Sequence, residues 1–356
     1  MNRGAILFRV DGTPASGYER LSRCLTYAAA LQRRRRPTFF LSQLEPRHLA
    51  FAVKRIGNNW LEADAPAGAE EDLEETIQEV RRLQAAAVIV DADVSREYLC
   101  ELGRTGTLLV SLDHLAAISF PSDLLINPLL APRREAYEFA DQTQVLLGPR
   151  YALVRPEVRR LRPARAQEPA QPFRALVALG EDDPHLQTGE LAQLLLQLPK
   201  VERVDMVARP QHPQLAELRQ LAEAHAGRLM LASEPAEVAA KLTRCHFAVT
   251  SGSGWSNELA CIGIPQLLVV QSEAHWPNAQ RLEEEGVALC LGRRGEVTTG
   301  QLRQAVQALT SDPLERQAMA RCGRKLIDGR GPDRLVTALE ILLHAVPPLA
   351  EFSEAA

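Results

Sequence analysis

Short apolar runs alternate with segments of helical periodicity along almost the whole chain, and this alternation narrows the possible folds more than any single motif. Apolar runs with the length of buried strands lie at residues 4–10, 38–41, 87–90 and 108–112. Between them, segments such as residues 20–33 repeat apolar side chains every three or four positions, which is the spacing of one helix face. Repeated strand and helix in this order predict α/β architecture with a parallel, doubly wound sheet.

The alternation occurs twice, on either side of a proline-rich segment. Residues 156–173 carry prolines at positions 156, 163, 169 and 172 among arginine, alanine and glutamine, a composition typical of an extended linker. We therefore predict one Rossmann-like domain over residues 1–155, a linker over 156–173, a second Rossmann-like domain over 174–346 and a frayed tail over 347–356. Two such domains predict a ligand in the cleft between them, because open α/β sheets bind ligands at the carboxyl ends of their strands.

A glycine-rich turn in the second half is the strongest local signal for a binding site. Residues 251–254 read Ser-Gly-Ser-Gly, between an apolar run at 247–250 and helical periodicity at 255–261. Free N–H groups at the start of such a helix, together with the helix dipole, form a site for an anion, most often a phosphate. Glu258 lies one turn into that helix, where its carboxylate could accept hydrogen bonds from a ribose. The structural alternative is a packing turn with a solvated Glu258.

Composition and absent motifs exclude several classes of protein. The 356 residues carry a formal net charge of -4 with a pI near 6.1, which gives no support to a nucleic-acid binder. Six cysteines without metal-ligand spacing indicate reduced thiols and no zinc site. No apolar run approaches the roughly 20 residues of a membrane helix and no secretion signal is recognisable, so we expect a soluble, cytoplasmic protein without a membrane span. The absence of Walker, HExxH and Ser-His-Asp patterns excludes P-loop enzymes, common zinc proteases and serine hydrolases.

Several stretches together resemble one known family. They are the glycine-rich turn with its flanks, RVDGTPASGYERLSRCL from residue 9, LLGPRYALVRPE from residue 146, ALGEDDP from residue 178 and IDGRGPDR from residue 327. These stretches resemble the UDP-2,4-diacetamido-2,4,6-trideoxy-β-L-altropyranose hydrolases of pseudaminic acid biosynthesis, and the related spore-coat polysaccharide proteins. The resemblance runs over about residues 4–340, and residues 147–157 are its most specific part.

The resemblance implies a GT-B fold, in which two Rossmann-like domains face a central cleft and the second domain holds most of the UDP. It implies that residues 251–254 cradle the pyrophosphate, that Gly180 lies near the phosphates and that Glu258 contacts the ribose. A UDP-sugar is then the expected partner. No metal or redox cofactor is implied, neither a nucleic acid nor a membrane span is expected, and the oligomeric state stays open.

The first loop departs from the family at its catalytic position. The family carries a Gly-x-Gly-His motif there, whose histidine acts as general base on the attacking water. Ungapped counting places this motif on Gly17, Tyr18, Glu19 and Arg20, so Arg20 stands where the base is expected. Arginine cannot serve as a base near neutral pH because its pKa stays above about 12, but it can pair with a phosphate or carboxylate.

Other polar positions of the family have changed as well. Its Asp-His-Tyr segment corresponds to Asp91, Ala92 and Asp93, and its Asn-Gln pair corresponds to Ala274 and His275. The following positions match the family pattern: Asp11, Arg23, Asp113, Asn127, Tyr151, Arg155 and Glu258. The pattern suggests a retained scaffold and nucleotide site with a rebuilt or lost water-activating site.

Residues that directly follow predicted strands are candidates to replace the missing catalytic base. His114 follows a strand end, and histidine titrates near neutrality, although a lone loop histidine is often structural. Asp11 and Asp91 each follow a strand and are expected to point into the cleft. We assign catalytic roles to Arg20, Asp11 and His114. We assign substrate contacts to Gly17, Asp91, Asp113, Asn127, Tyr151, Gly180, Ser251, Gly252, Ser253, Gly254, Glu258 and His275.

Three functions remain open at this point. A UDP-sugar hydrolase of surface-glycan or pseudaminic-type acid biosynthesis would release UDP by attack of water on the anomeric carbon, and the family resemblance favours it. A GT-B glycosyltransferase would use a sugar or protein hydroxyl in place of water. A non-catalytic UDP-sugar binder would serve surface-glycan or flagellin modification. The loss of the histidine at Arg20 favours the last two.

Overall fold

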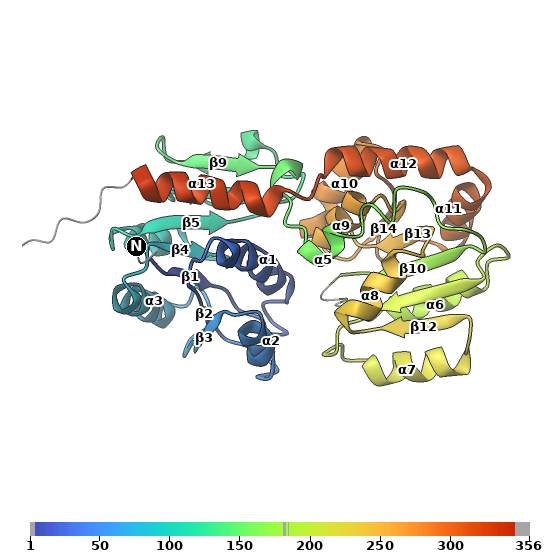
Figure 1. Cartoon of the computed structure of the whole chain (residues 1–356), viewed down its shortest axis with the longest axis horizontal. Helices are drawn as coiled ribbons and strands as arrows, with labels where there is room; N and C mark the ends of the chain where they lie inside the picture. The colour runs from blue at the N-terminus through green and yellow to red at the C-terminus, as the bar shows by residue number, and fades with distance from the viewer. Residues whose placement is uncertain (1–3, 181–182, 184, 346–356) are drawn as a thin grey trace, which may run out of the picture.

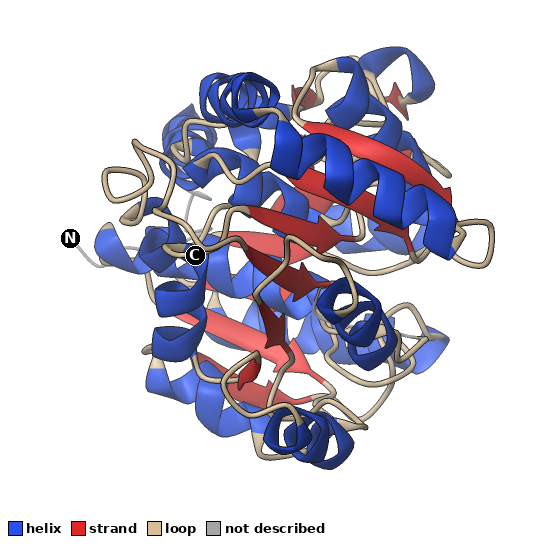
Figure 2. Ribbon diagram, turned by 90° about the vertical axis from the view of Figure 1, so that its right-hand side faces the viewer, coloured by secondary structure: helices blue, strands red, loops and turns tan. Residues whose placement is uncertain are grey.

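Two parallel sheets lie side by side, each with helices on both faces (Figure 1, Figure 2). The computed structural model describes residues 4–180, 183 and 185–345. Within each of these two sheets every strand pair is parallel. The expected α/β class with two doubly wound domains is confirmed. The predicted frayed tail at 347–356 lies outside the described residues.

The N-terminal domain is built on a seven-stranded sheet with the strand order β3-β2-β1-β4-β5-β7-β9, beside a two-stranded sheet of β6 and β8. Its central strands are buried on both faces, which explains why they read as continuous apolar runs. Its elements are β1 (Ile6–Arg9), α1 (Glu19–Arg33), β2 (Thr38–Ser42), α2 (Leu49–Arg55), β3 (Asn59–Glu62), α3 (Glu70–Leu83), β4 (Ala87–Val90), α4 (Arg96–Gly103), β5 (Leu108–Leu112), β6 (Ser119–Phe120), β7 (Leu124–Asn127), η1 (Arg134–Ala136), β8 (Glu138–Phe139), β9 (Gln144–Leu147) and η2 (Pro149–Tyr151).

The C-terminal domain is built on a six-stranded sheet with the order β12-β11-β10-β13-β14-β15. Two separate apolar clusters cover its two faces, because successive strand residues point to opposite sides. The elements after η2 are α5 (Pro156–Arg159), β10 (Arg174–Ala178), α6 (Thr188–Leu196), β11 (Arg203–Val207), α7 (Leu215–Ala224), β12 (Leu229–Ala232), α8 (Pro235–Leu242), β13 (Phe247–Thr250), α9 (Gly254–Ile262), β14 (Gln266–Val270), η3 (Glu273–His275), α10 (Trp276–Glu284), β15 (Ala288–Arg293), α11 (Thr299–Ser311), α12 (Pro313–Leu326) and α13 (Gly331–Ala345).

Each sheet has one point at which the strand order reverses. In the N-terminal domain this point lies between β1 and β4, and in the C-terminal domain between β10 and β13. Loops that leave the carboxyl ends of neighbouring strands diverge there and open a crevice, which is where open α/β sheets bind ligands. The loops after these four strands therefore position the candidate site.

The last helix, α13, returns to the N-terminal domain and lies along it (Figure 1). Its buried Leu335 and Leu339 join the same apolar core as Tyr27 of α1, and the Tyr27 hydroxyl donates to the Leu335 carbonyl at 3.2 Å. Arg36 donates to both oxygens of Glu340 at 2.9 and 2.7 Å. The expected domain boundary needs correction here, because residues 331–345 complete the first domain rather than the second.

The proline-rich segment also differs from the extended linker that its composition predicts. It begins with the short helix α5 and then packs against the C-terminal domain. Arg162 donates to the carbonyls of Cys261 and Ile327 at 2.6 and 2.7 Å, and Arg165 donates to the Cys245 carbonyl at 2.7 Å. Guanidinium groups satisfy carbonyls at the ends of secondary structures here, an interaction that local composition does not reveal.

Three elements differ from the sequence prediction. The apolar spacing of residues 44–56 predicts one helix over the whole segment, but α2 begins only at Leu49, because Leu44 pairs with Gly12 in the loop after β1. Strand β3 lacks an apolar run because it is a half-exposed edge strand. Helix α10, which the pattern did not predict, begins at Trp276 directly after η3.

Replacing Leu339 by alanine tests whether α13 belongs to the N-terminal core. Leu339 is fully buried, so Leu339→Ala should lower the free energy of unfolding by about 2 to 5 kcal/mol. Hydrogen exchange should accelerate first in β1 and α1. The control is Ile341→Ala on the same helix, where the side chain is 60% exposed and stability should barely change. Faster exchange confined to β10 and β13 would contradict this domain assignment.

Candidate functional site

A cavity of about 790 Å³, which we call the central cleft, lies between the two domains at the carboxyl ends of both sheets. The loops after β1, β4, β10 and β13 all contribute to its wall, so the two points of reversed strand order face each other. Of the residues expected in the site, the following line the central cleft: Gly17, Arg20, His114, Gly180, Ser251, Ser253 and His275. The structure thus brings together residues far apart in sequence.

The glycine-rich turn has the geometry that its sequence predicts. Gly252 has φ of +80°, and a Cβ there would lie 2.9 Å from Ala279 Cβ, so only glycine fits. Gly180 has φ of +108°, and a Cβ added to it would lie 3.1 Å from Ser253 Oγ. The loops after β10 and β13 therefore approach closely. Ser251 and Ser253 are 1% and 2% exposed, and their hydroxyl oxygens have no hydrogen-bond partner among the described residues.

A carboxylate of the N-terminal domain reaches the start of α9. The backbone N–H of Gly254 donates to Glu19 Oε1 at 2.8 Å, and Glu19 Oε2 lies 3.2 Å from His275 Nε2. Burial by itself raises the pKa of Glu19, but His275, Arg23 and the Gly254 N–H outweigh it and lower that pKa to about 2. Glu19 is therefore an anion at the place where the sequence predicts a phosphate.

His114 lies in a positively charged part of the central cleft. Its Nδ1 is 3.5 Å from both Nη1 and Nη2 of Arg23, and its ring centroid is 6.5 Å from that of His275. Arg23 in turn donates from Nε and Nη2 to the two oxygens of Asp91, which is 1% exposed. Burial and the charge of Arg23 lower the pKa of His114 to about 3. The ring is therefore neutral at physiological pH, and Asp91 positions Arg23 beside it.

Arg20 and Arg209 add positive charge to the opposite sides of the central cleft. Arg20 Nη2 lies 2.6 Å from Asp93 Oδ1, in a pair whose aspartate is 71% exposed. The guanidinium of Arg209 lies over the ring of Tyr18 at 3.7 Å from its centroid. The sequence pattern predicts neither the ion pair of Arg20 with Asp93 nor the position of Arg209 at the central cleft. Both depend on contacts between loops that are far apart in the sequence.

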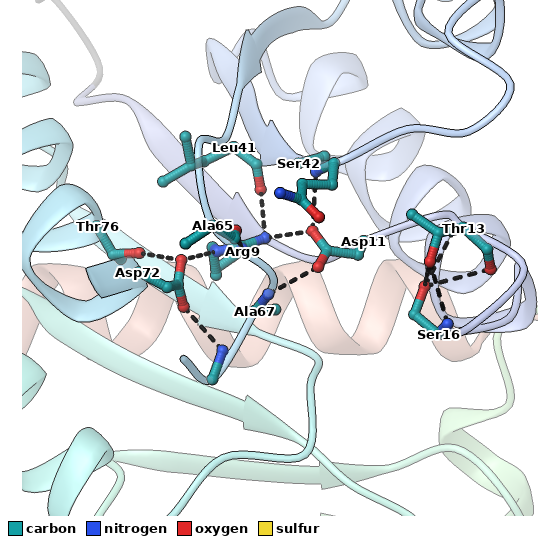
Figure 3. Close-up of polar contacts among 12 residues, drawn as sticks. Arg9, Asp11, Thr13, Ser16, Leu41, Ser42, Ala65, Ala67, Asp72 and Thr76 are labelled. Atoms are coloured by element: carbon teal, nitrogen blue, oxygen red, sulfur yellow. Dashed lines mark hydrogen bonds and ion pairs between the residues drawn. The ribbon is translucent and has the colours of Figure 1, made fainter. Parts of the chain in front are cut away.

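Asp11 does not face the central cleft, which corrects the expected role for it. It is 5% exposed and both of its oxygens are engaged within the N-terminal domain (Figure 3). Oδ1 accepts from Arg9 Nη1 at 2.6 Å and from the Gln43 N–H at 2.9 Å, while Oδ2 accepts from the Ala67 N–H at 2.7 Å. Arg9 also pairs with buried Asp72. This network holds the loops after β1, β2 and β3 together, so Asp11 shapes the domain rather than touching a ligand.

Three further residues that we expected to contact the substrate instead form contacts within the N-terminal domain. Asp113 Oδ2 accepts from the N–H groups of Leu115 and Ala116 at 2.8 and 2.7 Å. Asn127 is fully buried and accepts from the Leu129 N–H at 2.9 Å. Tyr151 packs against the apolar core of the N-terminal domain. None of Asp113, Asn127 and Tyr151 lines the central cleft among the residues that the structure describes.

Glu258 lies inside α9 with its carboxylate paired to the linker. It accepts from the backbone N–H of Arg155 at 2.8 Å and from the Nη2 of that arginine at 2.6 Å. The Arg155 guanidinium lies over the Trp255 ring, 4.6 Å from its centroid. Glu258 lines a small cavity of about 40 Å³ that also includes Gly254 and Glu19. Its contact with a ribose remains a prediction, and the Arg155 pair is a competing use of its oxygens.

The described residues contain no group of three or more His, Cys, Asp or Glu side chains that could hold a metal ion. All six cysteines are free thiols in the structure. Within the same residues, no helix combines the length and apolar character needed to cross a membrane.

Comparison with known proteins supports the architecture. No family model matches the chain. The spore coat polysaccharide biosynthesis protein SpsG of Bacillus subtilis is 26% identical over 225 residues, which cover 62% of this chain and 65% of that protein, so the similarity spans less than two thirds of the relative. Among solved structures, MurG of Acinetobacter baumannii has a TM-score of 0.66 at 14% identity and covers 95% of this chain and 99% of its own.

A second solved structure, the UDP-GlcNAc 2-epimerase of Neisseria meningitidis bound to UDP-GlcNAc, has a TM-score of 0.65 at 11% identity, with coverage of 94% and 100%. The spinosyn rhamnosyltransferase SpnG complexed with thymidine diphosphate has a TM-score of 0.62 at 16% identity, with coverage of 94% and 100%. Identities this low establish the fold alone. The chain has the GT-B arrangement of two Rossmann-like domains, as the sequence resemblance implies.

The buried state of His114 predicts a pH dependence of stability. The unfolded chain takes up a proton on this histidine below about pH 6.5, whereas the folded chain keeps the ring neutral until about pH 3. Folding is therefore destabilised as the pH falls through this window. Between pH 6 and 4, the unfolding free energy of the natural chain should fall more steeply than that of His114→Gln, by up to about 1.4 kcal/mol per pH unit.

Denaturant unfolding at half-unit pH steps measures this difference. Between pH 7.5 and 8.5 the histidine is neutral in both states, so the two proteins should show parallel curves there as an internal control. Parallel curves at acidic pH as well would contradict the buried, neutral state of His114.

Proposed function

We propose that the chain binds a UDP-sugar in the central cleft and transfers the sugar to an acceptor hydroxyl in polysaccharide biosynthesis. The observation that carries this proposal is the N-terminus of α9, which opens between the two points of reversed strand order and holds a carboxylate through the Gly254 N–H. A site that stabilises one anion in this way suits the diphosphate of a nucleotide sugar.

The diphosphate would lie against the glycine-rich turn. Ser251 and Ser253 have hydroxyl groups that lack partners among the described residues and that line the central cleft. Both can donate a hydrogen bond to a phosphate oxygen after a rotamer change. Glu19 must then leave Gly254, because its carboxylate and a phosphate cannot share one N–H and would repel each other. Arg20 and Arg209 line the same cleft and supply compensating charge.

The nucleoside fits a neighbouring pocket of about 240 Å³. This pocket shares Gly180 and Arg209 with the central cleft, so a ligand can extend from one into the other. Apolar side chains, among them Val238 and Trp255, form part of its wall and suit a flat base. Glu258 and Arg155 lie beside it, where displacement of their pair would free the carboxylate for a ribose.

The attacking hydroxyl must give up its proton, and His114 is the proposed acceptor. Its neutral ring can take a proton, but the neighbouring Arg23 makes it a weak base in the free protein. A diphosphate in the central cleft would add negative charge near the ring and raise its pKa, which improves it as a base. Arg20 would pair with the departing diphosphate, a role that suits a permanently charged guanidinium better than proton transfer.

Hydrolysis is the second candidate, favoured by the resemblance of residues 147–157 to the hydrolase family. In hydrolysis, water instead of an acceptor hydroxyl attacks the anomeric carbon, and the bond from this carbon to UDP breaks. Calorimetry with UDP and UDP-GlcNAc tests binding, and UDP release with and without oligosaccharide acceptors separates the two reactions. Release that depends on an acceptor supports transfer, while equal release without one supports hydrolysis. Binding without release in either assay would indicate a non-catalytic binder, and the absence of binding would overturn the proposal.

Glu19→Gln tests whether Glu19 occupies the diphosphate site. The substitution removes a negative charge but keeps the side-chain size, so UDP should bind about tenfold more tightly, equivalent to about 1.4 kcal/mol. The matched control is Glu45→Gln, which removes the same charge from another position on the wall of the central cleft. Its effect on the dissociation constant should be smaller. An unchanged or weaker affinity in Glu19→Gln would place the phosphates elsewhere.

A further inference from the structure

A second cavity, of about 520 Å³, lies at the other end of the C-terminal sheet. It is bounded by linker residues 165–168, by His246 directly before β13, by the loop between α9 and β14, and by one face of α12. Strand β13 runs away from this cavity toward the central cleft, so the two cavities lie at opposite ends of the same sheet. We call the second one the linker cavity.

Cations outnumber carboxylates in the linker cavity. Glu168 is the one carboxylate among its described lining residues, and it pairs with a guanidinium of α12. The cations that line the cavity are Arg165, Arg316, Arg321, Arg324 and Lys325. The charge of this wall is therefore strongly positive although the whole chain carries a formal net charge of -4.

Only some of these cations form ion pairs or hydrogen bonds within the protein. Arg316 pairs with Glu168 and donates to the Leu309 carbonyl. Arg324 donates from Nη1 to the Arg162 carbonyl at 2.7 Å, an acceptor without a full charge. Arg321 and Lys325, four residues apart on α12, form no ion pair with any residue that the structure describes. Four of the five cations that line the linker cavity, Arg165, Arg321, Arg324 and Lys325, thus have no carboxylate partner among the described residues.

A buried donor at this cavity lacks an acceptor among the described residues, and a buried histidine lies beside it. Arg165 is 5% exposed; its Nη1 donates to the Cys245 carbonyl, but its Nε has no partner within the described chain. His246 is 1% exposed and its Nδ1 accepts from the Arg174 N–H at 3.1 Å, so the proton of the neutral ring is on Nε2. Burial lowers the pKa of this ring, while the charge of Glu168 and a hydrogen bond to the Pro169 carbonyl raise it, so the Nε2–H lies beside groups that bound the cavity. A buried donor without an acceptor, such as Arg165 Nε, is rare in folded proteins and points to a missing partner.

The charge of Arg324 is itself destabilised in the described structure. Burial lowers its pKa, and the neighbouring cations Arg162 and Arg165 lower it further. An anion in the cavity would reverse this effect, because opposite charges stabilise one another most strongly where water is excluded. The geometry and the charge therefore require the same kind of ligand.

We propose that the linker cavity binds a small phosphorylated anion. Guanidinium groups present paired N–H donors that match the oxygens of a phosphate, and several cations without carboxylates suit a ligand of more than one negative charge. The volume lies within the range of small-molecule sites. Such a ligand would contact the linker and α12 together and would hold them on the C-terminal sheet.

Titration with inorganic pyrophosphate, followed by calorimetry and by the ¹⁵N signals of the histidine rings, tests this proposal. The double variant Arg321→Ala/Lys325→Ala removes two exposed cations of the cavity wall, and its affinity should fall at least about tenfold. The charge-matched control is Arg219→Ala/Arg303→Ala, which removes two exposed arginines of α7 and α11 and should bind as the natural chain does. The Nε2 signal of His246, assigned with His246→Gln, should shift on binding to the natural chain.

Each outcome decides the question. Pyrophosphate bound only in the central cleft would survive Arg321→Ala/Lys325→Ala and would leave the His246 signal unmoved, which overturns the proposal. Equal losses in both double variants would show a general charge effect and would overturn it as well. Repeating the titration with inorganic phosphate, UDP and glucose 1-phosphate identifies whether a free phosphate, a nucleotide or a sugar phosphate is preferred once the His246 shift is observed.

Discussion

The contact between Glu19 and the start of α9 is the interaction around which the central cleft is organised. A helix that begins in a cleft exposes backbone N–H groups that need acceptors, and here the acceptor for Gly254 comes from the other domain. The same carboxylate reaches His275, and Arg23 adds to the charges that keep it ionised. Burial and the charge of Arg23, which Asp91 fixes in place, lower the pKa of His114 and keep its ring neutral. A single carboxylate thus connects both domains and the candidate catalytic groups.

The loop after β1 thus places two oppositely charged side chains at the central cleft. They are Glu19 and Arg20, at the start of α1. The first supplies an internal anion to the site of the expected diphosphate, and the second supplies a cation at its rim. Under the proposed function, a diphosphate at the start of α9 would displace Glu19 from the Gly254 N–H.

Much of the fold could be predicted from local sequence pattern. The predictions that were wrong concern features that depend on contacts with distant residues or on exposure at a sheet edge. Strands β4, β5, β13 and β14 are apolar runs buried on both faces, which sequence periodicity detects directly. The edge strand β3 is half exposed and has no such pattern. The glycine-rich turn was recognisable because φ above zero requires glycine at Gly252. By contrast, Asp11 and Asp91 each follow a strand but neither lines the central cleft, because Arg9 and two backbone N–H groups hold Asp11 and Arg23 holds Asp91.

The sequence by itself determined the two α/β domains and the turn at residues 251–254, because each follows from spacing and residue type. Only the tertiary structure decided that α13 completes the first domain, that Glu19 lies against α9 and that five cations surround the linker cavity. These features join residues separated by up to hundreds of positions. Their energies depend on burial and on the distances between charges, neither of which a linear pattern contains.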